Sequence, residues 1–298
     1  MRNLPGDDPD ATAQRRAAIV IPHYNDTERL GRCLEALWPQ VIEGIEVIVV
    51  DNGSSQSLDG IRVRWPGVRI LTEAQKGAAH ARNRGVAETT ADRLLFIDSD
   101  CVPADDWVGT GLEVADRADL VGGLVAVFDE TPPPRSGAEA FETVFAFDFK
   151  SYIEKKGFSG SGNLVTWRRV FDRIGGFRAG MSEDLDWSHR ATAAGFSLVY
   201  EERLRVTHPS RSDWPALRHK WRRVTEELWG LEGRGAGARA RWAAKGLAMI
   251  PSILVHTPKV LRHPELDTRD KARALATLAR LRLQRAVWML RQAAGGTI

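Results

Sequence analysis

The chain has 298 residues, of which 43% are hydrophobic and 27% charged. This ordinary globular composition allows one large α/β domain with an appendage or two modest domains, and two cysteines exclude a disulfide framework. The net charge of +3 is uneven: 32 acidic residues face 22 basic ones up to Glu202, and 20 basic residues face 7 acidic ones from Arg203 onward. The basic part predicts an anionic partner, which is a membrane surface, nucleic acid or the acidic body itself.

Residues 1–16 are polar and acidic, which predicts a disordered leader and no secretory signal. Short β-branched runs then alternate with segments whose apolar residues follow helical spacing. We predict strands at 17–22, 45–50, 68–71, 93–97, 119–127 and 198–200, helices at 27–37, 77–87 and 187–194, and a loop at 131–137. This alternation is typical of an α/β fold with a doubly wound, mostly parallel sheet flanked by helices.

Three of the predicted strands end in polar loops, at residues 22–25, 51–54 and 98–100. In doubly wound sheets, ligands bind outside the carboxyl ends of the strands. We therefore expect the three loops to converge on one crevice.

From residue 231 to 298 we predict a basic, helical tail that follows the main domain at 17–230. Asp267 or Thr268 can cap its last helix, which carries an apolar stripe with arginines outside it. The stripe comprises Leu275, Leu278, Ala279, Ala286, Val287 and Leu290, and the arginines are Arg280, Arg282, Arg285 and Arg291. Packing on the body and docking on a membrane surface both remain open. The uncharged stretch 246–258 is too short to span a bilayer, and we interpret it as buried or interfacial.

Asp98-Ser99-Asp100 directly follows the predicted strand at 93–97. Two carboxylates at i and i+2 can converge on one hard cation, because Mg²⁺ and Mn²⁺ take oxygen ligands and share them with substrate phosphates. Aspartate is also common in turns, so the pattern alone is weak evidence. Its position beside two other polar strand ends favours a metal-diphosphate site.

Glycine and cations are combined in the stretch from Lys76 to Gly85. Lys76 and Arg82 can neutralise a diphosphate, and a helix that starts near Gly77 adds its positive end. Asp51 can accept a hydrogen bond from a base or a ribose hydroxyl. A solvated basic helix and an ordinary turn between strand and helix are the alternatives.

Three acids lie within residues 183–190, together with Trp187 and Arg190. Crowded carboxylates raise each other's pKa, which suits a general base, although acids in the first turn of a helix also complement its dipole. A lone histidine such as His208 is more often structural than a ligand.

Taken in order, these motifs resemble the family 2 glycosyltransferases of GT-A fold over about residues 17 to 210. The resemblance rests on Ile21-Pro22-His23-Tyr24-Asn25, Val49 to Ser54, Gly77 through Arg82-Asn83 to Gly85, Asp98-Ser99-Asp100, Gly160-Ser161-Gly162-Asn163, Gly175-Gly176-Phe177 and Glu183-Asp184. The basic tail is not covered by it.

The resemblance implies a nucleotide-sugar donor and a role for each matching residue. The nucleoside pocket would be lined by Pro22, Tyr24, Asn25, Asp51 and Ser54. Further donor contacts would come from Lys76, Arg82 and Asp98, with His23, Gly53, Gly77, Asn83, Ser99 and Asp100 completing the donor site.

The same resemblance implies the catalytic, metal and acceptor residues. Asp184 would be the general base with Glu183 beside it, and Asp100 and His208 would ligate Mn²⁺ or Mg²⁺. Gly162 and Asn163 would lie by the acceptor, to which we add Trp187 and Arg190. His23 and Trp187 depart from the usual pattern of the family and bear on which sugar and acceptor fit.

We therefore predict an inverting, metal-dependent hexosyltransferase that uses a UDP-, GDP- or dTDP-sugar and a saccharide or lipid-linked acceptor. It would serve cell-surface polysaccharide or glycolipid synthesis, in the cytoplasm or peripherally at the inner face of the plasma membrane, without nucleic acid. One alternative is a degenerate glycan-binding or scaffolding subunit. A sugar nucleotidyltransferase is the other, but it usually needs a Gly-rich basic loop after the first strand, where this chain has Pro22-His23-Tyr24-Asn25.

Overall fold

The computed structural model describes residues 17–180, 182–233 and 235–298, so the predicted leader lies outside the described residues. The chain forms two compact units. The sheet unit extends to Ala126 and includes Phe149–Ala179 and Glu183–His208, and the helical unit comprises Val127–Asp148, Gly180–Ser182 and Pro209–Ile298. The helical unit thus gathers more of the chain than the expected tail, whose boundary at residue 230 stays a prediction.

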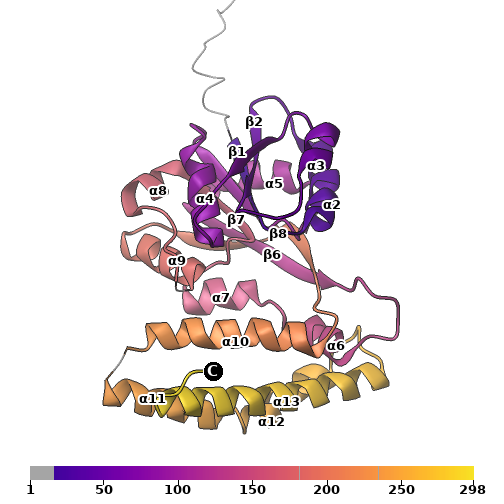
Figure 1. The fold of residues 1–298 in the computed structure, drawn as a ribbon, viewed down its shortest axis with the longest axis vertical. Coiled ribbons are helices and arrows are strands. Elements are labelled where there is room, and N and C mark those ends of the chain that lie inside the picture. The colour runs from indigo at the N-terminus through magenta and orange to yellow at the C-terminus, as the bar shows by residue number, and fades with distance from the viewer. Residues whose placement is uncertain (1–16, 181, 234) are drawn as a thin grey trace, which may run out of the picture. The chain divides into compact units, whose positions relative to one another are not determined.

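An eight-stranded sheet organises the sheet unit in the order β3-β2-β1-β4-β7-β6-β8-β5. Its parallel half consists of β1 (Ala17–His23), β2 (Ile45–Asp51), β3 (Arg69–Thr72) and β4 (Arg93–Ile97). All seven residues of β1 are buried, as its continuous apolar run predicts for a central parallel strand. Because β2, β1 and β4 are parallel neighbours, their carboxyl ends and the three polar loops lie at one edge of the sheet (Figure 1).

The other strands are β5 (Val102–Pro103), β6 (Leu120–Phe128), β7 (Asn163–Trp167) and β8 (Leu198–Pro209). β7 is antiparallel to both β4 and β6, and β5 is antiparallel to β8. The mostly parallel α/β prediction is confirmed for the half that ends in the polar loops. The pairing of Val102 with Thr207 matters for the site, because it brings the chain after Asp100 beside the end of β8.

Helices cover both faces of the sheet (Figure 1). They are α2 (Thr27–Leu37), α3 (Asp59–Arg64), α4 (Ala78–Ala87), α5 (Trp107–Val114), α7 (Phe149–Lys156), α8 (Arg168–Ile174) and α9 (Glu183–Ala193). In α2, Asp26 caps the N-terminus and the predicted stripe of Leu30, Cys33, Leu34 and Leu37 is buried. Residues of α4, α8 and α9 share one core with the sheet, centred on Phe96, Phe171, Phe177 and Trp187.

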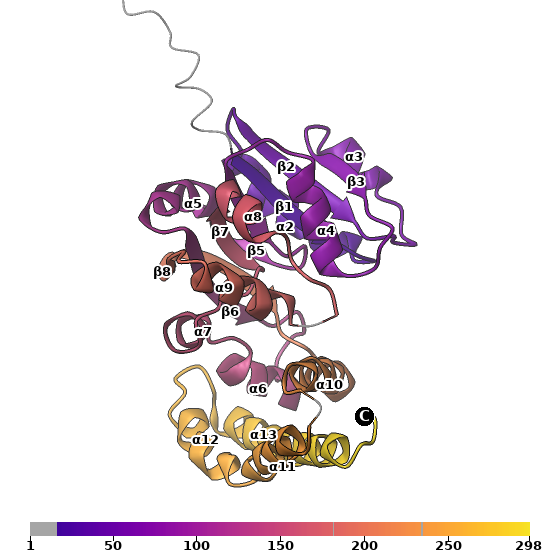
Figure 2. The same cartoon turned by 90° about the vertical axis from the view of Figure 1, so that its left-hand side faces the viewer.

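The helical unit contains α6 (Gly137–Phe145), α10 (Trp214–Leu231), α11 (Ala236–Ala248), α12 (Ser252–Leu261) and α13 (Thr268–Ala293). Within this unit, α6 and α10 lie on one side of a layer formed by α11, α12 and α13 (Figure 2). The long helix α13 packs against the other four, and its buried residues include Ala274, Leu278 and Leu281.

Two expectations about this unit need correction. Asp267 caps α13, as predicted. The buried face of this helix, however, includes Arg285, whereas Val287 and Leu290 are exposed. The stripe therefore lies about one residue further round the helix than the sequence pattern indicates. The uncharged stretch 246–258, for which the sequence leaves a buried or an interfacial position open, is largely exposed, so only the buried alternative is wrong. In the described part of the chain, no helix has both the length and the apolar character needed to cross a bilayer.

Candidate active site

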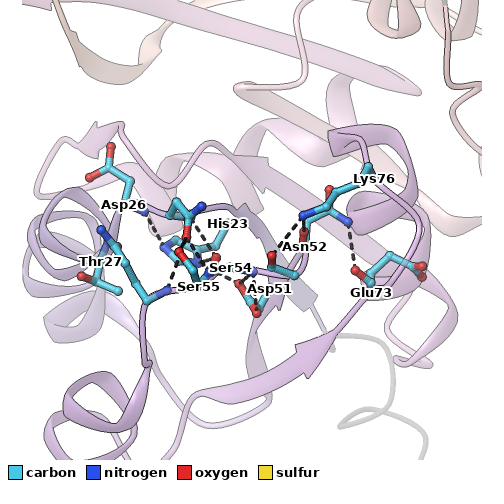
Figure 3. A network of polar contacts seen from close by, with 12 residues as sticks. His23, Asp26, Thr27, Asp51, Asn52, Ser54, Ser55, Glu73 and Lys76 are labelled. Atoms are coloured by element: carbon cyan, nitrogen blue, oxygen red, sulfur yellow. Dashed lines mark hydrogen bonds and ion pairs between the residues drawn. The ribbon is translucent and has the colours of Figure 1, made fainter.

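The loops that follow β1 and β2 are joined by hydrogen bonds. Asn25 has a positive φ of 50°, a conformation that asparagine adopts more readily than most residues. Its backbone N–H donates to Ser54 Oγ at 2.8 Å, and its side-chain oxygen accepts from the N–H of Ser55 at 2.7 Å. Hydrogen bonds thus join two of the predicted donor-binding loops into one polar network (Figure 3).

His23 belongs to this network and is buried, with 2% of it exposed (Figure 3). Its Nε2 accepts a hydrogen bond from the N–H of Asp26, so its Nδ1 carries the proton that points to Asp51 Oδ1, 3.3 Å away. Asp51 also accepts from the N–H of Ser54. His23 therefore orients the carboxylate of Asp51, and its predicted direct contact with the donor stays a prediction.

Asn52 connects the end of β2 to the loop before α4. Its amide nitrogen donates to the carbonyls of Glu73 and Gln75, and its amide oxygen accepts from the N–H of Gly77 at 2.7 Å. Lys76 Nζ donates to the carbonyls of Asn52 and Gly53 and lies 4.4 Å from the ring centre of Tyr24 (Figure 3). This fixes a cation beside an exposed aromatic ring at the strand ends.

The side chain of Arg82 extends from α4 to the loop after β4. It is 4% exposed and donates to Asp98 Oδ1 at 2.6 Å and to Glu183 Oε1 at 2.5 Å. The surrounding carboxylates, Asp98 first, raise its pKa against the effect of burial. Gly162 lies against the same carboxylate, because a Cβ at this position would stand 2.6 Å from Asp98 Oδ2. Asp98, Gly162 and Glu183 are therefore neighbours, and their roles as donor, acceptor and catalytic residues stay predictions.

Asp184 lies in the first turn of α9, next to Glu183. Burial raises the pKa of Asp184 from 3.8 to about 6, with Arg82 acting in the opposite direction and Glu183 adding to the rise. Its Oδ1 and the hydroxyl of Ser161 are buried and make no hydrogen bond of regular geometry within the described residues, although the Ser161 hydroxyl lies close enough to lower the pKa of Asp184. An open acceptor and an open donor at one place suit the binding of a polar group from outside the chain.

Asp100 and His208, the two predicted metal ligands, meet across the β5–β8 pairing. Asp100 Oδ2 and His208 Nε2 are 3.2 Å apart, and both side chains are partly shielded from solvent. Within the described ranges, no cluster of three or more His, Cys, Asp or Glu side chains forms a complete metal cage. Two ligands fit a cation that takes its remaining oxygens from substrate phosphates and water, as Mg²⁺ does.

Asn163 and Trp187 do not lie where an acceptor could reach them. Asn163 is fully buried, where its amide accepts from Trp107 Nε1 and donates to the carbonyls of Leu124 and Leu204. Trp187 is also fully buried and its Nε1 donates to the carbonyl of Gly175. Both acceptor assignments are corrected, because all the polar groups of these side chains are used inside the fold.

Arg190 and Asn83 are likewise engaged by backbone. Arg190 donates to Asp186 and to the carbonyls of Ile174 and Gly176. Asn83 exchanges two hydrogen bonds with the backbone of Phe177, its nitrogen donating at 2.8 Å and its oxygen accepting at 2.9 Å. These side chains stabilise the segment that leads into α9, and their predicted contacts with acceptor and donor stay predictions.

Other candidates are distributed as follows. Pro22 is buried within β1, Tyr24 is exposed, and Ser99 is partly exposed beside Asp98. Gly77, with φ of 125°, directly precedes α4. Sequence reasoning missed Ser161 and Asn52 as individual residues. The Gly-Ser-Gly run around Ser161 was the available signal, since glycines allow close approach on either side of a hydroxyl.

Solved structures of similar fold define the class of protein. The chain aligns with mannosyltransferase PcManGT from Pyrobaculum calidifontis, in complex with GDP-Man and Mn²⁺, with a TM-score of 0.55 and 18% identity over 95% of this chain and 76% of that one. It aligns with S. aureus TarS 1-349, in complex with UDP-GlcNAc, with a TM-score of 0.52 and 12% identity over 94% and 92%. The fold is that of the GT-A glycosyltransferases.

Sequence comparison places the chain within this class. Residues 18–186 match the model of the family described as glycosyl transferase family 2. Glycosyltransferase AglE of Haloferax volcanii is 30% identical over 78% of this chain and 82% of its own length. The pre-mycofactocin glycosyltransferase of Mycobacterium tuberculosis is 29% identical over 70% of this chain and 46% of its own. The chain belongs to glycosyl transferase family 2 and is a glycosyltransferase with a nucleotide-sugar donor.

Proposed function

We propose that the protein is an inverting, metal-dependent hexosyltransferase that acts on a hydroxyl of a saccharide or lipid-linked acceptor. One observation carries the proposal: the buried carboxylate of Asp184 has an open oxygen and a pKa raised to about 6. A base with a pKa near the working pH takes up a proton most effectively. The product would belong to cell-surface polysaccharide or glycolipid synthesis, made at the cytoplasmic side of the membrane.

The donor would lie along the carboxyl ends of β1, β2 and β4. Asp51 is oriented to accept from the base or ribose, with Tyr24, Asn25 and Ser54 around it. Lys76 supplies a cation for the diphosphate at the same edge. The named neighbours hold GDP-Man or UDP-GlcNAc, which supports a GDP- or UDP-sugar and leaves dTDP-sugars as the third candidate.

Asp100 and His208 would hold Mn²⁺ or Mg²⁺ through the Oδ2 and Nε2 atoms that now face each other. When bound, the cation supplies positive charge for the diphosphate. The PcManGT structure with Mn²⁺ supports this part of the proposal. Arg82 is engaged by Asp98 and Glu183, so we assign it to positioning these acids rather than to direct contact with diphosphate.

The reaction would be a single displacement. Asp184 accepts the proton of the acceptor hydroxyl, and the oxygen of that hydroxyl forms a bond to the anomeric carbon. The bond from that carbon to the diphosphate oxygen breaks, and the electron pair leaves with the nucleoside diphosphate. Attack on the face opposite the leaving group inverts the configuration. The open hydroxyl of Ser161 can accept or donate a hydrogen bond that orients the acceptor.

The test begins with thermal shift in UDP-, GDP- and dTDP-sugars, each with Mn²⁺ or Mg²⁺, and continues with diphosphate release from the best donor. We expect Asp184→Asn to bind this donor normally and to lose about a thousandfold in turnover. The exposed Asp172→Asn on α8 serves as control. Turnover near wild type in Asp184→Asn contradicts the base assignment, and no response to any nucleotide favours a scaffolding subunit.

A further inference from the structure

An uncharged row of side chains runs along the outside of the helical unit from Leu247 to Leu261. Hydrogen bonds from Met249 to Gly246 and from Leu254 to Pro251 continue the helical winding through the turn that joins α11 to α12. Heptad spacing therefore places five exposed residues on one face, namely Leu247, Pro251, Leu254, Pro258 and Leu261. An apolar heptad row normally faces a partner, and here it faces outward.

The exposure at the middle of this row is large. Leu254 is 77% exposed and Val255 is 73% exposed, and Ile250 stands beside them. On α13, Leu283, Val287 and Leu290 form a second exposed row at i, i+4 and i+7. The two rows adjoin, because Leu290 Cγ lies 3.6 Å from the place a Cβ would take on Gly246. We call these residues the apolar surface. Adjoining exposed apolar side chains of this kind mark an interaction site.

Basic residues stand at both ends of the row. Lys245 precedes it, Lys259 and Arg262 follow its centre, and stretch 246–258 contains no charged residue. From residue 231 to 298 the chain has 13 basic and 4 acidic residues. Amphipathic elements that lie on anionic membranes combine an apolar face with basic flanks in this way.

The dimensions fit an element that lies along a membrane. At 1.5 Å per residue, stretch 247–261 is roughly 22 Å long, shorter than the roughly 30 Å of a hydrocarbon core. A second copy of the chain fits less well. Parallel pairing would bring Lys259 and Arg262 of the two copies together, and antiparallel pairing would set them against Lys245, whose charge is already engaged by Glu232.

We propose that the apolar surface docks on an anionic lipid bilayer, with α12 in the plane of the interface. Leu254 and Val255 enter the headgroup–acyl boundary, and Lys259 and Arg262 remain among the anionic headgroups. The inference deepens the proposed function, on which it rests for its purpose, since a lipid-linked acceptor is met at such a surface.

Flotation with lipid vesicles tests the docking. The full-length chain is mixed with phosphatidylcholine vesicles that contain or lack phosphatidylglycerol. We expect wild type to float with the anionic vesicles and Leu254→Ser/Val255→Ser to partition at least about tenfold less. The Lys259→Gln/Arg262→Gln variant should partition onto anionic vesicles about fivefold less for each charge removed. At high salt its partitioning should equal that of wild type.

Matched controls come from exposed residues of the sheet unit. Val63→Ser/Ile42→Ser removes apolar side chains that are 83% and 64% exposed, and Lys155→Gln/Arg62→Gln removes two exposed charges. These controls should float as wild type does. Nucleotide-dependent thermal shift and donor hydrolysis on the same samples report the proposed function separately, because neither requires vesicles.

Three results would overturn the docking proposal. They are a wild type that stays in the pellet with anionic vesicles, a Leu254→Ser/Val255→Ser variant that floats normally, and a concentration-dependent wild-type dimer that the same variant abolishes in the absence of vesicle binding. The last result identifies a second copy as the occupant. Normal flotation together with no nucleotide response would contradict the proposed function and still support the docking proposal.

Discussion

Arg82 in the sheet unit and Arg285 in the helical unit are 4% and 6% exposed, yet their surroundings differ. Arg82 donates to two carboxylates and lies near a third, that of Asp184. Arg285 stacks on Trp221 at 4.5 Å and makes no ion pair with any carboxylate of the described residues. Carboxylates raise the pKa of Arg82, whereas burial, and then Arg282, lower the pKa of Arg285 to about 10.

The difference separates two reasons for burying a cation. Arg82 lies among three acids, Asp98 after β4 and Glu183 and Asp184 in the first turn of α9, so its charge is matched. Arg285 contributes a long apolar stem and a flat group that stacks on an indole, while its charge is left unmatched. Charge is thus matched in the candidate active site and left unmatched between α10 and α13.

Removing the matched cation should give the largest effect. In Arg82→Met, Asp98, Glu183 and Asp184 lose their common partner, so we expect unfolding free energy to fall by about 3 kcal/mol and turnover to become very low. The pKa of Asp184 should rise further, because Arg82 now lowers it. Urea denaturation and the pH profile of residual turnover check this.

Arg84→Gln is the control, since Arg84 lies on the same helix and is exposed. Arg84→Gln should keep the unfolding free energy within about 0.5 kcal/mol of wild type and should leave turnover and its pH profile unchanged. A stable, active Arg82→Met protein would contradict the idea that matched charge organises this site.

The pH dependence of the reaction should follow Asp184. Burial raises its pKa to about 6, and a general base acts only when deprotonated. We expect kcat/KM to be level above pH 7 and to fall about tenfold per unit below pH 6. Initial rates between pH 5 and pH 8 measure this, with Asp172→Asn expected to keep the profile. A flat profile through pH 6 would mean that another group takes the proton.

Stability should show the opposite trend at the same residue. The folded state binds a proton at Asp184 more tightly than the unfolded chain does, because the pKa rises from 3.8 to about 6. This contribution is full below pH 3.8 and is lost as pH rises toward 6. Asp184→Asn should therefore be about 2 kcal/mol more stable than wild type at pH 7.5, with no gain near pH 4. A gain that does not depend on pH would point to packing instead.

Much of the sheet unit could be predicted, because a continuous apolar run indicates a buried strand and an apolar stripe at helical spacing indicates a packed helix. The buried runs at β1, β2 and β4 and the stripe of α2 appear where the patterns indicate. Two boundaries differ by more than one residue. The helix expected from 187 begins at Glu183, where acids suit a first turn, and β8 runs to Pro209 although exposed charges such as Arg203 interrupt its apolar pattern.

Other features could not be predicted from position in a motif. Asn163 and Trp187 stand beside functional residues in sequence but point into the core, and a motif does not specify the direction of a side chain. Helix α6 was missed although Ser136 and Glu139 form a capping box, a signal visible in the sequence. The sequence pattern predicts Arg285 outside the apolar stripe, whereas the structure buries it; a cation is rarely buried without a partner.

Replacing the buried Arg285 should give the smallest effect. Arg285→Met keeps a long apolar side chain against Trp221 and removes a buried, unmatched charge. Losing the stacking costs up to about 1 kcal/mol, whereas relief of desolvation and of repulsion from Arg282 is larger, so we expect a net gain of about 1 kcal/mol. Arg280→Met is the matched control, because Arg280 stacks on Trp214 at 3.9 Å but is exposed and should change little. Urea denaturation at neutral pH distinguishes the two, and a loss of more than about 1 kcal/mol in Arg285→Met would show that the charge of Arg285 is matched after all.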